Sequence, residues 1–303
     1  MDKIVVAIPT FRRPESLLRL LKALEGLSTS LSVSVLVADN DKERSEGLRL
    51  CAGLSPSYRW PLESVLVRER GISQARNALI SRAFAGGCDF VAMIDDDEWP
   101  SQRWLDELVR MQRATAADLV QGSILFECPP EKMQYRACEG ISSIRRPSGA
   151  VDMLQGAGNL LIARACLQGL AQPFFDPQFG LSGGEDAEFF VRAARAGKRF
   201  AWCDEAIVYG EIPSERLRLS WILSRAFSVG NSDMHVALKH SSSWRVRVAE
   251  AAKISGALLL APVLAIPLAL FPSRRLAAPR LFFRAAGKAV AMLGIRHEGY
   301  ARP

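Results

Sequence analysis

Three aspartates stand side by side where an apolar run ends. The run Phe90–Ile94 (FVAMI) is followed directly by Asp95, Asp96 and Asp97. Adjacent carboxylates repel one another unless a cation neutralises them, and Mg²⁺ or Mn²⁺ prefers carboxylate oxygens and often bridges to substrate phosphates. A helix N-terminal cap before Trp104–Met111 is the alternative, but a cap needs one aspartate rather than three. We therefore predict a divalent-metal site at this position.

A second acidic segment follows a pair of glycines. Gly183 and Gly184 precede Glu185 and Asp186, which open a helical pattern. The glycines allow the backbone to approach a ligand closely, and a carboxylate there can act as a general base on a hydroxyl. Acidic residues in a first helical turn also interact well with the helix dipole. General base and cap both remain open on this segment alone.

Two basic segments have the composition of a phosphate site. In the segment from Arg70 to Asn77, Ser73 is placed to cap a helix, and Arg76 lies one turn in, which suits a phosphate. Trp221 and Arg225 are four residues apart on one helix face, where arginine and an aromatic ring together can grip a pyrophosphate. Taken alone, a plain capped helix and an amphipathic surface helix explain these two segments better.

Strands and helices alternate through the first half of the chain, and this alternation must position these residues. Near-continuous apolar runs with helical spacing between them predict an α/β fold with a mostly parallel sheet. In such sheets ligands lie beyond the carboxyl ends of strands, which is where Asp39 and the three adjacent aspartates fall. Residues 129–152 read as a mobile loop or insert. The predicted strands are Ile4–Ile8, Val33–Ala38, Ser64–Val67, Phe90–Ile94 and Leu119–Phe126, and the first helices are 14–27 and 72–85.

The composition is that of a globular protein and excludes several classes. Of 303 residues, 49% are hydrophobic and 23% charged, which argues against a disordered chain, a collagen-like repeat or a polytopic membrane protein. The six cysteines are scattered without C-x-x-C spacing, and no secretory signal is read at the N-terminus, so reduced thiols in the cytosol are expected. A Walker loop and a nucleophile elbow are absent, which disfavours a P-loop kinase or an α/β-hydrolase.

An uncharged stretch interrupts a basic C-terminal region. Residues 212–303 hold 14 Lys and Arg against 4 Asp and Glu, whereas residues 1–211 hold 25 against 28. The segment 254–273 has no charge and is long enough to cross a bilayer core. Basic residues flank it on both sides, and Pro262 and Pro267 disfavour a straight helix, so a re-entrant or interfacial hairpin on an anionic membrane fits better than a single crossing. A soluble helical bundle is the alternative.

Taken in order, these segments resemble a family 2 glycosyltransferase of the GT-A fold. The resemblance is carried by VVAIPTFRRPESLLRLLKAL, the strand-end Asp39, GISQARN, IDDDEWPSQRWLDEL and GGEDAEF. The tail, with GEIPSERLRLSWILSRAFSVGNS and RAAGKAVAMLGIRHEGY, is similar to glucosyltransferases of succinoglycan-type exopolysaccharide assembly. The resemblance implies a Rossmann-like catalytic domain over residues 1–213. It also implies a basic helical region over residues 214–303 that associates with a membrane.

The resemblance implies a role for each matching residue on the donor side. Pro9, Thr10 and Asp39 line the nucleobase and ribose pocket, with Asp39 accepting a hydrogen bond from uracil. Arg76 contacts the donor phosphates or helps to shape that pocket. The D-x-D pattern falls on the three aspartates, with Asp97 the expected direct ligand of Mg²⁺ or Mn²⁺, Asp95 a second ligand and Asp96 part of the nucleotide site.

On the acceptor side, Asp186 matches the base position, with Glu185 beside it. Trp221 and Arg225 lie where processive relatives carry Q-x-x-R-W, and the absence of that motif predicts addition of a single sugar. The stretch IVYGEIP has no histidine to serve as a further metal ligand, so Glu211 is the candidate.

The implied reaction is an inverting, metal-dependent transfer of a sugar, expected to be glucose, from a UDP-sugar. The implied acceptor is a lipid-linked saccharide at the cytoplasmic face of the bacterial inner membrane, and the basic region meets that membrane rather than a nucleic acid. Two alternatives remain. One is a polyprenyl-phosphate sugar transferase, and the other is a catalytically inactive, membrane-bound sugar- or nucleotide-binding protein.

Overall fold

The computed structural model describes residues 1–135, 138, 142–241, 243–271 and 274–299. These residues form two compact units. The first comprises residues 1–125, 144–180 and 185–211, and the second comprises residues 126–143, 181–184 and 212–303. Each unit is described by itself.

A mixed sheet forms the centre of the first unit. Its strand order is β3-β2-β1-β4-β8-β6-β9-β5, and the additional strand β7 pairs with β9. The half β3-β2-β1-β4 is parallel, as predicted, because helical crossovers connect these strands, while β8 runs antiparallel to β4 and β6. The strands are β1 (Lys3–Thr10), β2 (Ser32–Asp39), β3 (Leu62–Leu66), β4 (Phe90–Met93), β5 (Glu98–Pro100), β6 (Leu119–Glu127), β7 (Gly149–Val151), β8 (Leu160–Ala163) and β9 (Phe200–Glu211).

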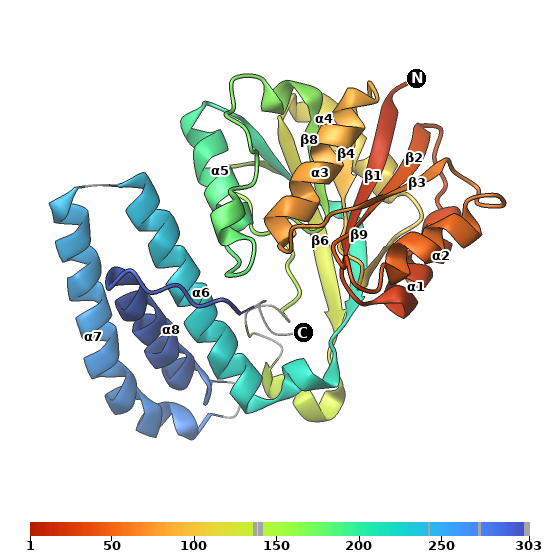
Figure 1. The fold of residues 1–303 in the computed structure, drawn as a ribbon. Coiled ribbons are helices and arrows are strands. Elements are labelled where there is room, and N and C mark those ends of the chain that lie inside the picture. The colour runs from red at the N-terminus through yellow and green to blue at the C-terminus, as the bar shows by residue number, and fades with distance from the viewer. Residues whose placement is uncertain (136–137, 139–141, 242, 272–273, 300–303) are drawn as a thin grey trace. The chain divides into compact units, whose positions relative to one another are not determined.

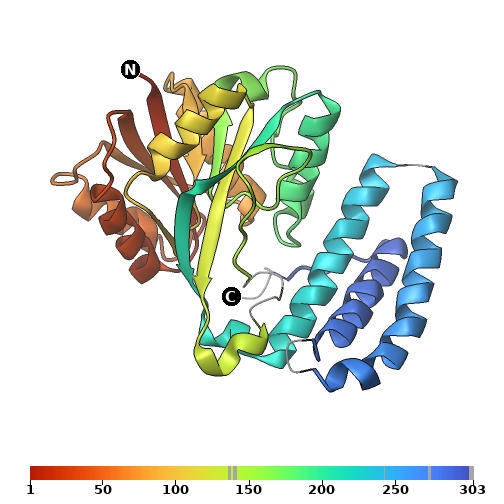
Figure 2. The same cartoon turned by 180° about the vertical axis from the view of Figure 1, so that it is seen from behind.

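Helices cover both faces of this sheet. Helices α3 (Ile72–Ala85) and α5 (Glu185–Arg195) lie over one face (Figure 1), where their apolar side chains join the buried core of β1, β2, β4 and β8. Helix α4 (Trp104–Thr115) lies over the opposite face (Figure 2). Helices α1 (Pro14–Glu25) and α2 (Glu46–Leu54) complete the crossovers beside β1 and β2. Helix α1 buries leucines at helical spacing, namely Leu17, Leu20, Leu21 and Leu24.

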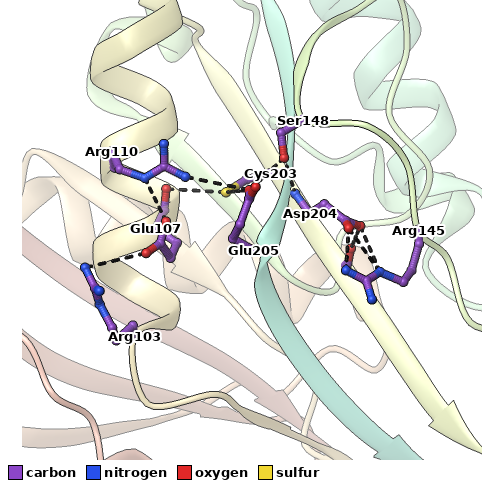
Figure 3. A network of polar contacts seen from close by, with 9 residues as sticks. Arg103, Glu107, Arg110, Arg145, Ser148, Cys203, Asp204 and Glu205 are labelled. Atoms are coloured by element: carbon purple, nitrogen blue, oxygen red, sulfur yellow. Dashed lines mark hydrogen bonds and ion pairs between the residues drawn. The ribbon is translucent and has the colours of Figure 1, made fainter.

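Residues 129–152 are not a single loop. They contain a short 3₁₀ helix at Pro130–Tyr135 and the strand β7, while residues 136–137 and 139–141 lie outside the described part of the chain. A polar network holds the segment before β7 to β9 (Figure 3): Arg145 Nε donates to Asp204 Oδ2 at 3.0 Å, and Ser148 Oγ donates to Glu205 Oε2 at 2.6 Å. The expectation of a mobile insert missed these contacts because their partners lie more than 50 residues away.

The second unit is built on three helices, α6 (Leu219–His240), α7 (Trp244–Ala269) and α8 (Ala277–Met292). Helices α6 and α8 cross where Gly230 meets Gly287. A Cβ on Gly230 would lie 2.0 Å from the Arg284 oxygen, and one on Gly287 would lie 2.0 Å from the Phe227 oxygen. Such close backbone approach requires glycine at both positions.

Helix α7 runs through Pro262 and Pro267 without a break, although the two prolines favoured an interruption. The chain reverses after α7 and returns along it as α8, and Lys288 of α8 pairs with Glu250 of α7 at 3.2 Å. The predicted hairpin is therefore formed by α7 and α8 together rather than within 254–273.

The pairing of Asp204 with Arg145 should make stability depend on pH. Hydrogen bonding from Arg145 lowers the pKa of Asp204 to about 2, against about 3.9 in an unfolded chain. Asp204→Asn should therefore lower the free energy of unfolding at neutral pH by about 1–2 kcal/mol. Because the folded pKa is depressed, this difference should hold down to about pH 5 and narrow as the pH falls through about 3.9 toward 2.

Urea unfolding of the wild type and of Asp204→Asn across this range measures the difference. Asp152→Asn, which alters an exposed carboxylate, is the control. A difference that widened as the pH fell would contradict this account of the network.

Candidate active site

The carboxyl ends of β1, β2 and β4 bring three predicted site segments together. Thr10 is level with Asp39 in the β1–β2 ladder, and Ala7 is level with Met93 of β4. The chain beyond Met93 therefore comes alongside the buried end of β1, and the Thr10 hydroxyl donates to Asp96 Oδ2 at 2.7 Å. The parallel sheet thus joins the N-terminal motif to the aspartate segment.

Asp39 is buried at the end of β2, and its carboxylate fixes the chain that follows. Its Oδ1 accepts the Asp41 backbone N–H at 3.0 Å, and its Oδ2 accepts that of Leu48 at 2.9 Å. A Cβ on Gly47 would lie 2.8 Å from Thr10 Cγ2 and 3.1 Å from Asp39 Oδ2, so the start of α2 packs closely over both residues. Asp39 thus fixes the chain between β2 and α2, and its bond to uracil stays a prediction.

The acidic segment has four members rather than three, because Glu98 is also buried there. Arg13 lies against it and contacts Asp96 Oδ1 at 3.2 Å and Asp97 Oδ2 at 2.9 Å. Burial raises the pKa of Asp96 to about 6, although the positive charge of Arg13 acts to lower it. Burial and the neighbouring carboxylates raise the pKa of Glu98 well above its usual range. The cluster carries more negative charge than Arg13 balances.

The carboxylates of Asp95 and Glu98 converge over Gly158. A Cβ at Gly158 would lie 3.3 Å from Asp95 Oδ2 and from both carboxylate oxygens of Glu98. Hard oxygen donors around such a cradle suit Mg²⁺ or Mn²⁺, which commonly takes one or two carboxylates and completes its shell with phosphate and water. Within the described residues, no group of three or more His, Cys, Asp or Glu side chains is arranged so that it could hold a metal ion by itself. The donor set therefore fits a cation shared with a diphosphate.

Glu211 ends β9 near this cluster, since its neighbour Gly210 pairs with Glu98 in the β5–β9 ladder. Its side chain is 61% exposed and contacts Arg19 at 2.7 Å. The structure thus brings the Glu211 backbone beside the acidic segment, and its role as a metal ligand stays a prediction.

Arg76 connects the acidic segment to the start of α5. Its side chain is 6% exposed, and its two terminal nitrogens contact Asp95 Oδ1 at 3.2 Å and Glu185 Oε1. Burial and the adjacent Asp186 raise the pKa of Glu185 to about 7, with Arg76 opposing. Burial alone would lower the pKa of Arg76, but Glu185 and Asp95 outweigh it and raise that pKa. Two segments predicted separately therefore belong to one cluster.

Asp186 follows Glu185 in the first turn of α5 and is less buried. Its Oδ1 accepts the Ala187 backbone N–H at 2.7 Å, and its Oδ2 lies 3.7 Å from the place a Cβ on Gly156 would occupy. Asp186 thus lies beside the Gly-rich segment that leads into β8.

Trp221 and Arg225 belong to the second unit, on α6. Trp221 packs against a small apolar cluster that includes Leu217 and Ile222, and the Arg216 guanidinium lies 5.9 Å from its ring centre. Their predicted role beside the nucleotide stays a prediction.

Three residues that organise the first unit's site were not singled out from the sequence: Arg13, Glu98 and Asn159. Buried Asn159 donates to the backbone oxygens of Ser123 and Ala206 at 2.8 and 2.7 Å and accepts from Trp104 Nε1 at 2.6 Å. These bonds hold its neighbour Gly158, over which Asp95 and Glu98 converge. Arg13 and Glu98 lie within the motifs TFRRPES and IDDDEW, which carry the family resemblance, so the sequence did offer a signal for both residues. Asn159 gave no such signal, because its partners come from three distant segments.

Comparison with known proteins identifies the family. Residues 5–150 match the model of Glycosyl transferase family 2. The chain is 29% identical over 268 residues to the succinoglycan biosynthesis protein ExoM of Rhizobium meliloti (strain 1021), a match that covers 86% of this chain and 84% of ExoM. It is also 26% identical over 249 residues to the hyaluronan synthase of Pasteurella multocida, covering 69% of this chain but 24% of the synthase.

Solved structures share the fold. The S. aureus TarS 1–349 structure in complex with UDP has a TM-score of 0.52 at 15% identity and covers 97% of this chain and 92% of that chain. The structure of GalNAc-T7 with UDP, GalNAc and Mn²⁺ has a TM-score of 0.57 at 12% identity and covers 78% of this chain and 47% of that chain. Together with the sequence matches, these similarities confirm the resemblance seen in the motifs: residues 5–150 match glycosyl transferase family 2, and the chain shares the GT-A fold of these structures.

Proposed function

We propose that this glycosyltransferase moves one sugar from a UDP-sugar, with inversion, to a lipid-linked saccharide acceptor in cell-surface polysaccharide biosynthesis. The observation that carries the proposal is the bridge through Arg76, which joins the acidic segment after β4 to the acidic turn that opens α5. A site for a diphosphate-bound cation and a candidate base therefore lie within one cluster. The resemblance to exopolysaccharide glucosyltransferases favours glucose as the sugar.

The acidic segment serves the leaving group. A divalent cation held by Asp95 and Asp97, with Glu211 as a further candidate ligand, would neutralise charge on the departing diphosphate. Thr10 and Arg13 orient Asp96 and Asp97 through the contacts described above. We assign Pro9, Thr10 and Asp39 to the nucleoside pocket, and the resemblance also assigns Trp221 and Arg225 to the nucleotide site.

Asp186 is the better placed of the two α5 carboxylates to act as base. Glu185 is buried and paired with Arg76, whereas Asp186 is less buried and lies beside Gly156. Asp186 removes the proton from the acceptor hydroxyl as that oxygen attacks the anomeric carbon, and the bond to the diphosphate breaks on the opposite face. An α-linked donor therefore gives a β-linked product.

The α7–α8 hairpin offers the membrane contact that a lipid-linked acceptor requires. Among helices in the described part of the chain, α7 alone is long and apolar enough to cross a membrane. It buries Ile254 and Ala261, at helical spacing, half-buries Leu258 and Leu268, and leaves most of its other large apolar side chains exposed. The exposed side chains include Leu259, Leu260, Val263, Leu264, Ile266, Leu270 and Phe271 of the α7 region and Leu281, Phe282 and Phe283 of α8.

The charges of α8 favour insertion into one leaflet over a crossing. Arg284 pairs with Asp233 of α6 at 2.6 Å, and Lys288 pairs with Glu250 of α7, so α8 stays alongside its neighbours. A crossing by α7 would carry these charged groups into hydrocarbon, which is costly. Immersion of one apolar flank leaves the basic residues at anionic headgroups. The protein thus acts as a monotopic or peripheral enzyme at the cytoplasmic face of the bacterial inner membrane.

Asp186→Asn tests the assigned base. The amide keeps the shape but cannot accept the proton, so UDP release from UDP-glucose with polyprenyl-pyrophosphoryl monosaccharides should fall by about 10²- to 10⁴-fold. UDP affinity, measured by calorimetry with Mn²⁺, should stay near the wild-type value. Asp152→Asn is the control for an exposed carboxylate. Near wild-type turnover by Asp186→Asn would exclude this residue as the base.

The variant Val263→Asp/Ile266→Asp tests the membrane contact. It places two charges on the exposed flank of α7 and should strongly reduce flotation of the full chain with phosphatidylcholine–phosphatidylglycerol vesicles. Wild-type binding should also weaken on pure phosphatidylcholine and at about 0.5 M NaCl, where headgroup attraction is screened. Leu293→Asp, which alters an exposed leucine just beyond α8, should bind as the wild type does. Equal flotation of the double variant and the wild type would overturn the assignment.

A further inference from the structure

The guanidinium of Arg76 is occupied by protein carboxylates on both sides. One terminal nitrogen contacts Asp95, which directly follows β4, and the other contacts Glu185, which opens α5. These two partners stand 19 residues after and 109 residues after Arg76 in the chain. The ring of Phe175 lies 5.7 Å from the guanidinium carbon. Arg76 is thus a buried ionic clamp between the end of β4 and the start of α5.

We propose that Arg76 is a positioning residue that sets the separation between the acidic segment and the base-bearing turn, and does not bind the donor phosphates. The inference rests on the proposed function. With 6% of its side chain exposed and both terminal nitrogens engaged, Arg76 presents little surface to a nucleotide. Its planar fork is suited to holding two carboxylates in a fixed geometry, which a lysine ammonium cannot reproduce.

The consequence concerns the turn that carries Asp186. Glu185 is its direct neighbour, so the bond from Arg76 fixes the backbone from which the Asp186 side chain projects. If Arg76 were neutral, the carboxylates of Asp95 and Glu185 would face each other without a counter-charge and would move apart. Small displacements of a reacting group cost a large part of the rate without a matching change in ground-state binding. The loss should therefore fall on kcat rather than on nucleotide affinity.

The variants Arg76→Gln and Arg76→Lys test whether the loss falls on kcat or on UDP affinity. Turnover of UDP-glucose with polyprenyl-pyrophosphoryl monosaccharides should fall at least about 100-fold in Arg76→Gln, and Arg76→Lys should recover a minor part of it. The Kd for UDP with Mn²⁺, measured by calorimetry, should change less than about threefold. A tenfold or greater rise in that Kd, of about 1.4 kcal/mol or more, would instead make Arg76 a donor-binding residue and overturn the proposal.

A matched variant separates positioning from general stability. Arg192 pairs with Glu188 on the same helix α5 at 3.1 Å, away from the acidic segment. Arg192→Gln should lower the melting temperature yet leave kcat close to wild type. If Arg76→Gln folds poorly, Glu185→Gln keeps the side-chain shape and weakens the same clamp, and it should show the same fall in kcat at unchanged UDP affinity.

The remaining outcomes distinguish the two claims. An active wild type together with an Arg76→Gln variant of nearly equal kcat would overturn the positioning role and leave the proposed function standing. A wild type that binds UDP but releases none from any UDP-sugar and acceptor would overturn the proposed function, and the positioning role with it.

Discussion

Mutual repulsion among carboxylates is the constraint on which the rest of this structure depends. Asp95, Asp96, Asp97 and Glu98 follow one another at the end of β4, and Arg76 draws Glu185 and its neighbour Asp186 to the same cluster. Two guanidinium groups, those of Arg13 and Arg76, face these six acidic groups. Protonation relieves part of this repulsion, since the pKa values of Asp96, Glu98 and Glu185 are raised. Added positive charge relieves it too, and a divalent cation supplies that charge most compactly.

The fold brings these charges together by ordinary means. Parallel strands end at one edge of the sheet, so Thr10, Asp39 and the segment after Met93 meet there. Asn159 joins β6, β9 and α4 through three buried hydrogen bonds, and so fixes Gly158, over which Asp95 and Glu98 converge. A side chain at Gly158 would fill that space. Buried hydrogen bonds of Asn159 therefore position the backbone under the site.

The sequence was sufficient to predict the elements whose pattern is local. The apolar runs that became β1, β2, β4 and β6, and the helix 72–85 that is α3, have clear periodicity, and the family and GT-A fold are confirmed. Residue spacing also indicated the aspartate segment at a strand end. The short strands β5 and β7 were missed, because each is three residues long and depends on pairing with β9.

Long-range pairing within the site lay beyond prediction for the same physical reason. The resemblance implied that Arg76 contacts the donor phosphates or helps to shape the nucleotide pocket, and its partners in the fold, Asp95 and Glu185, could not be read from the sequence around it. The contacts of Arg13 with Asp96 and Asp97 span more than 80 residues. Nothing in the local sequence distinguishes an arginine that meets substrate from one that meets another part of the chain.

Crystals grown with UDP and Mn²⁺ and measured at the manganese absorption edge would test the central claim most directly. The account predicts a strong anomalous peak at the end of β4, within coordination distance of the carboxylate of Asp95 or Asp97 and of the UDP diphosphate. Bound UDP whose diphosphate lies away from these aspartates, or a peak at another place in the chain, would contradict it.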